Sequence, residues 1–421
     1  MNTVDKLLQT SGAEQLLPVG KADDAKARIQ EDFLFWKETL FRFLKDNFKL
    51  KEHELKYEPS VAVVEDDSLQ LADLHLSEPI PSKTAQIGAA NSIIRPLSIK
   101  QSRELFKSTN RNYIHIELNL QDHPQLTYKT GDHLAIWPIN PDEEVNRLLR
   151  VLGLTERRDV LILINALESS VKIKLPSPTT LDALFRHYVE ICASVSRDTV
   201  KTLVQFAPNS NAKAYFESLS RDKETYAELL THTHVNVGRL LELATKDDPN
   251  TVWSDLPSAF LIEALPVMQP RYYSISSSSV LCPRRPSITA LISNTSLVRN
   301  PESSIPGLTS NYILSLSNML VVDVSKSTPG ALTYKLDGPS DVLKGGKVFA
   351  HIRRSKFKLP MQSTCPLIMV AAGTGLVPFR AFVAERARLL AIGRTVGDMM
   401  LIFGCRYPNE DFIYLDELNQ F

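Results

Sequence analysis

The sequence is short of several features that would point to particular classes of protein. Its 421 residues include only four cysteines, which are widely spaced and form no Cys-x-x-Cys pair. Neither a disulfide framework nor a zinc site is therefore predicted, and a reducing compartment is the default expectation. The nine histidines show no metal-ligand spacing, so no metal centre is expected.

Long apolar runs and an excess of one charge are also absent. No run approaches the roughly 20 residues that cross a bilayer, and the first residues lack the basic and apolar regions of a signal peptide, so the chain is expected to be soluble as given. The 48 Lys and Arg residues balance the 48 Asp and Glu residues, so the chain has no overall positive charge that would attract nucleic acid or an acidic membrane. Because the charges balance, any anion-binding site must be formed by a local group of residues. Neither a Gly-x-Ser-x-Gly motif nor a Cys/His nucleophile context is present, so hydrolase chemistry has little support.

The first part of the chain changes its pattern several times, and its length allows two to three domains. Residues 25–48 place apolar side chains at helical spacing, with a short strand predicted at 16–20 before them. Residues 51–81 are polar and acidic, as in a linker. A β pattern then begins near residue 86.

Helical signals interrupt this β pattern from residue 141 to about 244. The predicted helices cover residues 143–152, 180–194, 198–206 and 226–243. Short strands are predicted before and after them, at residues 113–118, 134–138, 271–275, 287–292 and 347–352. A helical insertion within a β domain is therefore expected.

A third pattern begins at residue 366. A buried strand at 367–372, a glycine turn, a helix at 378–391 and a second buried strand at 399–403 form the opening of a parallel α/β domain. The chain stops about 60 residues into this domain, where such a sheet needs roughly twice that length, so the domain is expected to be truncated. The predicted fold class is multidomain, α+β followed by α/β.

The most informative stretch is Arg271-Tyr272-Tyr273-Ser274, which joins a cation, two aromatic rings and a hydroxyl before a run of serines. Side chains alternate faces along a strand, so Arg271 and Tyr273 are expected on one surface with Ser274 at the far end. This set suits a flavin, because arginine neutralises a pyrophosphate, tyrosine lies against an isoalloxazine, and serine reaches a ring nitrogen. For these four residues alone, an ordinary half-buried edge strand is the alternative.

Two glycine turns stand before predicted helices, where free backbone amides and the helix dipole favour a phosphate. Gly373-Thr374-Gly375 follows a buried strand, and Gly307-Leu308-Thr309-Ser310 precedes a helix at 312–316. The alternative for Gly373-Thr374-Gly375 is a tight strand-to-helix connection without a ligand, and the alternative for the Gly307 loop is a plain helix N-cap. The basic stretch at 353–358 is either a phosphate or acidic-partner contact or a solvated loop.

The order of these motifs resembles that of the diflavin reductases, from about residue 5 to the end. The motifs are Thr130-Gly131-Asp132-His133, the helical insertion, Arg271-Tyr272-Tyr273-Ser274, Gly307-Leu308-Thr309-Ser310, the stretch from Gly373 to Arg380, and Phe403-Gly404-Cys405-Arg406. The resemblance implies a ferredoxin-reductase-type antiparallel FAD barrel over residues 82–360, with a helical connecting insertion at about 141–250. It also implies the C-terminal remnant of a flavodoxin-like FMN domain at 1–50, a linker at 51–81, and a partial NADPH-binding domain at 361–421.

The resemblance also implies roles for single residues. Arg271 is expected on the FAD pyrophosphate, Tyr273 on the isoalloxazine with Tyr272 beside it, and Ser274, the predicted catalytic residue, near flavin N5. Arg111 and Thr374 match NADPH-contacting positions. The other expected FAD contacts are Thr289, Ala290 and Leu291 on the next strand and Gly307, Leu308, Thr309 and Ser310 in a pyrophosphate loop.

The implied activity is that of a reductase that passes a hydride from NADPH to FAD, and then electrons to FMN and to cytochrome P-450 or another heme protein. A sulfite reductase flavoprotein and a non-catalytic FAD-binding fragment are the alternatives. By the same resemblance, the FMN loops, the catalytic cysteine and acidic residue, and the aromatic residue that covers the flavin lie outside these residues. Family members are attached to the cytosolic side of the endoplasmic reticulum by an N-terminal helix, which this sequence lacks.

Overall fold

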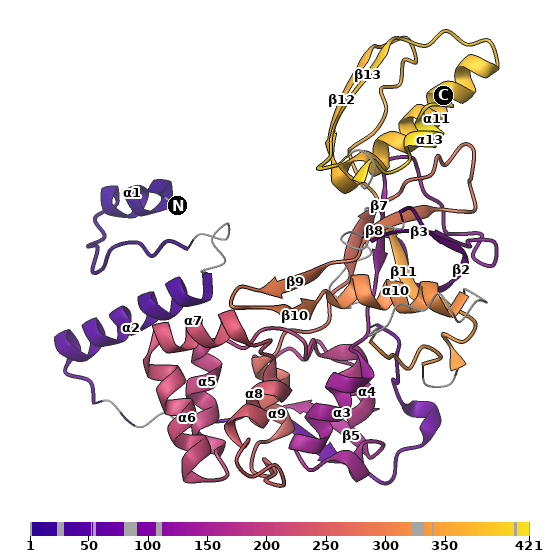
Figure 1. Ribbon diagram of the computed structural model, residues 1–421. Coiled ribbons are helices and arrows are strands. Elements are labelled where there is room, and N and C mark those ends of the chain that lie inside the picture. Colours follow the sequence, from indigo (N-terminus) through magenta and orange to yellow (C-terminus); the bar gives the residue numbers. More distant parts are fainter. Residues whose placement is uncertain are drawn as a thin grey trace.

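The computed structural model describes residues 2–22, 29–51, 53, 56–79, 91–106, 112–320, 332–338, 341–407 and 411–420. Figure 1 shows the N-terminal helices at one side, a helical block below, a strand-rich body beside it and the C-terminal α/β part at the far end. The barrel strands thus lie between the helical block and the C-terminal part.

The central body is a six-stranded antiparallel sheet in the order β7-β4-β11-β2-β3-β8. A bridge between Ile275 and Ile288 brings the two edge strands together, so the sheet nearly closes into a barrel. Apolar side chains of alternate positions fill its interior, and helix α10 packs against β2, β3 and β8. The elements are β2 (Arg95–Glu104), β3 (Tyr113–Leu118), β4 (His133–Ile136), β7 (Arg271–Ser274), β8 (Ser287–Leu291), β11 (Lys347–Arg353) and α10 (Leu308–Leu320).

The helical insertion has its own apolar core, separate from that of the barrel. Its helices are α3 (Asp142–Val151), η3 (Thr155–Arg157), α4 (Leu181–Ala183), the π-helical η4 (Leu184–Tyr188), α5 (Arg197–Leu203), η5 (Val204–Phe206), α6 (Ser210–Arg221), α7 (Lys223–His232), α8 (Val237–Ala244) and α9 (Ser258–Ala264). The helix predicted at 180–194 ends early, at Tyr188. The helix predicted at 226–243 is two helices, because the Asn236 side chain accepts a hydrogen bond from the Arg239 N–H and caps α8.

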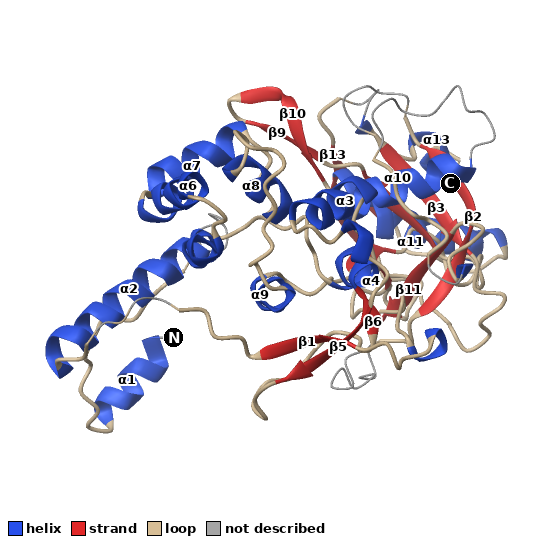
Figure 2. Cartoon of the chain, turned by 90° about the horizontal axis from the view of Figure 1, so that it is seen from below, coloured by secondary structure: helices blue, strands red, loops and turns tan. Residues whose placement is uncertain are grey.

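The stretch predicted as a linker carries ordered structure. Strand β1 (Val61–Glu65) pairs with β5 (Leu161–Ala166), which pairs with β6 (Thr179–Thr180), and η2 (Leu71–Asp73) follows β1. This small sheet lies at the edge of the helical insertion in Figure 2. Residues 61–65 therefore pack with the insertion.

The N-terminal part consists of α1 (Asn2–Thr10) and α2 (Ile29–Phe48). The short strand predicted at 16–20 is not formed, since these residues have no β partner in the described chain. None of the helices in the described ranges is long and apolar enough to cross a membrane.

The C-terminal part confirms the predicted parallel α/β pattern, but the prediction that its strands are buried is wrong, since Ile368 is 75% and Val370 67% exposed and only one face of the pair is covered by described residues. Strand β12 (Leu367–Ala372), turn η8 (Gly373–Leu376), helix α11 (Val377–Ala391) and strand β13 (Met399–Gly404) follow one another, and α13 (Leu415–Leu418) comes last. Residues Leu367 to Ala372 pair in parallel with Met399 to Gly404. The predicted fold class, an antiparallel barrel with a helical insertion followed by parallel strands, is confirmed.

Candidate functional site

The site begins at β7, which carries the predicted flavin residues. This strand pairs with β4, and the pairs run from Arg271 opposite Ile136 to Ser274 opposite His133. Alternation along the strand places Arg271 and Tyr273 on one face and Tyr272 and Ser274 on the other. The expected sharing of a face by Arg271 and Tyr273 therefore fits the register.

The two tyrosines have different surroundings. Tyr273 packs against the barrel core, and its burial raises its pKa to about 12. Tyr272 is 45% exposed, with the Arg353 guanidinium 4.5 Å above its ring and His351 edge-on at 6.1 Å. Burial, together with Arg353, lowers the pKa of His351 to about 4, so this imidazole is neutral at pH 7. Tyr272 thus lies against cationic and aromatic groups of β11.

In the described chain, β7 and β8 pair only at the bridge between Ile275 and Ile288, and the place beyond it where the two strands lack ladder hydrogen bonds is called the β7–β8 gap. Because the two strands run antiparallel from this bridge, the Arg271 end of β7 and the Leu291 end of β8 lie at the same end of the barrel. Ser293, just beyond β8, accepts a hydrogen bond at 2.7 Å from the Gly307 N–H and donates its own N–H to Ser310 Oγ at 3.2 Å. The predicted pyrophosphate loop therefore lies at the open end of this β7–β8 gap.

The start of α10 is built to receive an anion. The first N–H groups of a helix have no partner within the helix, and the helix dipole favours negative charge there. Thr309 is 4% exposed, and its hydroxyl has no hydrogen-bond partner within the described part of the chain. A side chain at Gly307 would meet the Ser293 carbonyl oxygen and Ser310 Oγ at 2.7 Å, so the loop has room only for glycine. Leu308 starts the helix and is partly buried. These residues fit a bound pyrophosphate.

Arg271 is held by a carboxylate of the helical insertion. Its Nη2 donates to Glu190 Oε1 at 2.6 Å and its Nη1 donates to the Gln269 carbonyl at 2.7 Å. The side chain is 38% exposed, so one side of the guanidinium faces solvent. Sequence reasoning missed Glu190, because its pairing with Arg271 depends on how the insertion folds back onto β7.

The predicted contacts on β8 are more enclosed than those on β7. Ala290 is 1% exposed, and Leu291 packs partly buried against Tyr113 and the C-terminal core. The Thr289 hydroxyl hydrogen-bonds the hydroxyl of Tyr414, which also lies 2.7 Å from His115 Nδ1. The Thr289 side chain therefore contacts the C-terminal part, and its role at the flavin remains a prediction.

Thr374 lies in η8, between β12 and α11, where it was predicted. Gly373 has a φ of +52°, which a residue with a side chain rarely adopts, and no atom crowds its Cα. Arg111 lies outside the described residues. The structure therefore brings the β7 residues and the α10 loop to one end of the barrel, with Thr374 at the turn that starts the C-terminal part.

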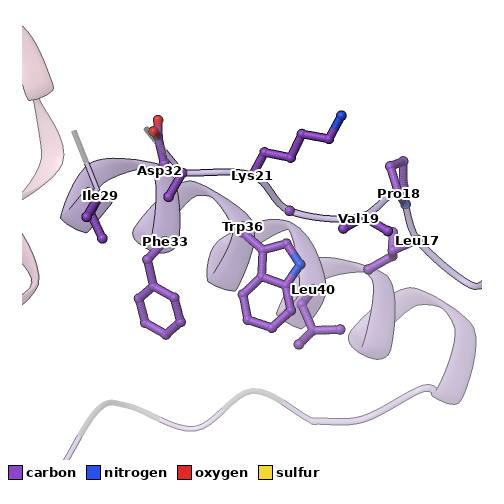
Figure 3. Close-up of a pocket in the computed structure, with 11 residues that line it drawn as sticks. Leu17, Pro18, Val19, Lys21, Ile29, Asp32, Phe33, Trp36 and Leu40 are labelled. Carbon is purple, nitrogen blue, oxygen red and sulfur yellow. The ribbon is translucent and has the colours of Figure 1, made fainter. Parts of the chain in front are cut away.

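A cavity of about 580 Å³ lies away from the barrel, between residues 17–22 and α2. Trp36, Phe33 and Leu40 line it, together with Leu17 and Val19 (Figure 3). It shares no residue with the predicted flavin or NADPH contacts, so it is a separate feature of the N-terminal part.

Comparisons with known proteins agree with the geometry. A family model described as FAD binding domain matches residues 91–312, and one described as oxidoreductase NAD-binding domain matches residues 369–421. The NADPH-cytochrome P450 reductase of Aspergillus fumigatus is 42% identical over 98% of this chain and 59% of its own length. That of Aspergillus niger is 41% identical over the same shares, and that of Candida maltosa is 35% identical over 99% of this chain and 61% of its own.

The chain thus spans about three fifths of the length of these relatives. The FAD-binding match covers more than half of the chain and contains the whole β7–β8 gap and the start of α10. The nucleotide-binding match begins within β12, at residue 369, and covers η8, α11 and β13. The chain therefore belongs to the FAD-binding domain family, and its C-terminal part carries an oxidoreductase NAD-binding domain.

Proposed function

We propose that the chain is part of an NADPH-dependent flavoprotein reductase in which FAD lies along the β7–β8 gap. The observation that supports this most is the buried, unpartnered hydroxyl of Thr309 at the N-terminus of α10. This anion-binding end lies at the same end of the barrel as Arg271. One end of the gap therefore supplies donors for a pyrophosphate, and Ser274 lies toward the closed end.

Ser274 is the residue that we expect to act on the reaction. Bound FAD would supply the chemistry, a hydride acceptor at N5 and one-electron transfer onward. The Ser274 hydroxyl would donate a hydrogen bond where charge changes at that nitrogen, and Tyr273 would orient the ring from the neighbouring position. Arg271, with Glu190 behind it, would hold the pyrophosphate.

The electron acceptor follows from the relatives rather than from the site. The relatives reported above are named NADPH-cytochrome P450 reductases, which favours cytochrome P450, or another heme protein, over sulfite reductase as the partner. We assign FMN and attachment to the endoplasmic reticulum to the whole protein, by the resemblance to diflavin reductases. Phe33, Phe35 and Phe41 of α2 are more than half exposed, which supports a larger N-terminal domain that would cover them.

Anaerobic addition of NADPH to the whole protein, reconstituted with FAD, tests this function, because the chain spans only about three fifths of the length of its relatives. The visible absorption of oxidised flavin is expected to bleach, and it should return when oxygen is admitted. A flavin that stays oxidised under excess NADPH, although dithionite reduces it, would rule out the reductase function.

Replacing Ser274 by Ala tests the role of its hydroxyl. The rate constant of flavin reduction by NADPH is expected to fall about 100-fold, because one preorganised donor to the changing charge is lost. FAD content should stay near that of the wild type. Ser315→Ala removes a partly buried serine hydroxyl from the middle of α10 and serves as the control. An unchanged rate in Ser274→Ala at full FAD occupancy would reject the role.

A further inference from the structure

The serine run that follows β7 joins the barrel to the C-terminal part. Ser278 Oγ donates to Glu385 Oε2 at 3.1 Å, and Thr130 Oγ1 donates to the same oxygen at 2.6 Å. The Ser279 N–H donates in turn to Thr130 Oγ1 at 3.0 Å. One carboxylate oxygen of α11 thus accepts hydrogen bonds from two separate segments of the barrel.

Both barrel segments are directly connected to the predicted flavin strand. Ser278 comes four residues after Ser274, and Thr130 comes three residues before His133, the partner of Ser274 in the sheet. Glu385 itself lies on α11, which starts where the nucleotide turn Gly373–Leu376 ends. The contact therefore links the segments next to the predicted flavin strand to the helix that follows the nucleotide turn. Hydride transfer would require these two parts to bring the flavin and the nicotinamide together.

A second contact of α11 reaches the same serine run. Arg380, in the first turn of α11, donates from Nη1 to the Ser276 carbonyl at 2.9 Å. Its Nε donates to Glu417 Oε2 at 2.7 Å, and its guanidinium lies 4.5 Å from the centre of the Tyr414 ring. The Arg380 side chain is therefore held on both sides, and α11 contacts the barrel through Arg380 and Glu385, about a turn and a half apart.

We propose that Glu385 is a positioning residue that fixes the nucleotide turn relative to Ser274, through its hydrogen bonds to Ser278 and Thr130. This inference rests on the proposed function, because it assigns the contact to hydride transfer. Hydride transfer requires the two reacting atoms within a few tenths of an ångström of their productive distance, and a misplacement of about 1 Å costs up to about 100-fold in rate. Glu385 touches neither ring, so its loss should change this distance and leave flavin binding intact.

The test compares Glu385→Ala, Ser278→Ala and the double variant with the wild type, all reconstituted with FAD. In Glu385→Ala the rate of flavin reduction at saturating NADPH is expected to fall about 10-fold, while FAD content and the rate with dithionite stay unchanged. Glu385→Gln keeps one acceptor oxygen and should recover part of the rate. The effects of Ser278→Ala and Glu385→Ala should be non-additive, as for residues that share one hydrogen bond.

Hydrogen exchange tests the contact without any nucleotide. Amides of residues 276–279 and 373–380 should exchange faster in Glu385→Ala than in the wild type, while those of β3 stay protected. Arg388→Ala is the matched control, because Arg388 is exposed on the last turn of the same helix. Equal reduction rates, or equal exchange at both segments, would overturn the proposal. A wild-type flavin that NADPH leaves oxidised overturns the proposed function instead, and the inference that rests on it.

Discussion

At the scale of single residues, a substitution at Thr309 should weaken flavin binding without affecting folding. Its buried hydroxyl has no partner within the described ranges, so Thr309→Val removes no hydrogen bond from the protein without flavin. Stability without FAD should be unchanged or slightly higher, whereas the dissociation constant of FAD should rise about 5- to 10-fold, as for one lost hydrogen bond. Equilibrium titration of flavin fluorescence measures this constant.

The matched control is Thr202→Val in the helical insertion. Its hydroxyl bonds the Asp198 carbonyl at 3.3 Å within its own helix, far from β7 in the sequence. This variant should bind FAD like the wild type. Equal FAD affinity in Thr309→Val and Thr202→Val would exclude Thr309 from the pyrophosphate site.

A second residue, His187, links folding to pH. It is 6% exposed, neither ring nitrogen has a partner among the described residues, and burial with a contribution from Arg186 lowers its pKa to about 3. In the unfolded chain the His187 imidazole binds a proton near pH 6.5, whereas in the folded protein it stays neutral at that pH. The stability that His187 contributes is therefore complete above pH 6.5 and is lost as pH falls toward the folded pKa. By pH 5.5 this one histidine should cost about 1.4 kcal/mol.

Replacing His187 by Leu should remove that part of the acid sensitivity. Urea unfolding at pH 7.5 and 5.5 measures the difference in free energy of unfolding, which should shrink by about 1.4 kcal/mol in the variant. His232→Leu, at a histidine whose side chain is 44% exposed, is the control and should keep the wild-type difference. An unaltered pH difference in His187→Leu would show that this imidazole is accessible to protons in the folded protein.

At the scale of elements, the turn before β4 depends on one glycine. Gly131 has a φ of +89°, and a Cβ there would lie 2.0 Å from the Phe357 carbonyl oxygen. Gly131→Ala should therefore lower the free energy of unfolding by at least about 2 kcal/mol, from strain and the displaced backbone. Gly393→Ala, at a φ of +78° with no atom within 4 Å, should cost only about 1 kcal/mol. Equal costs in urea titrations would contradict the close packing of residues 131 and 357.

Some of the helices and strands can be predicted from sequence patterns, and others cannot. Strand β3 was predictable because its apolar side chains alternate, strand β12 because it is a continuous apolar run, and helix α11 because a glycine turn and Pro378 mark its start. The break between α7 and α8 was not predicted, although residues 231–234 are polar. The backbone is extended at Thr233, and the side chain of Asn236 caps the start of α8. Strand β1 was missed although Val61, Val63 and Val64 are β-branched, because this run is short, stands within a polar stretch and gains its order from pairing with β5.

At the scale of the whole molecule, the sequence indicates which residues carry chemistry better than it indicates what holds them. The motif around Arg271 and the loop at Gly307 stand out by their residue types together with their order among the other motifs, since each alone also fits an ordinary strand or N-cap. Glu190, Glu385 and Tyr414 do not, because each becomes significant only when segments far apart in the sequence meet at β7, α11 or β8. Sequence alone could not identify such partners, since an isolated carboxylate or phenol has no distinctive pattern.

The most direct test of the account is the FAD content of the purified chain. After incubation with FAD and removal of the excess by gel filtration, the visible spectrum should show close to one flavin per wild-type chain. Arg271→Ala should retain much less, because it loses the paired donors expected on the pyrophosphate. A wild-type chain that emerges colourless, or an Arg271→Ala chain that keeps as much flavin as the wild type, would contradict the assignment of the β7–β8 gap as the FAD site.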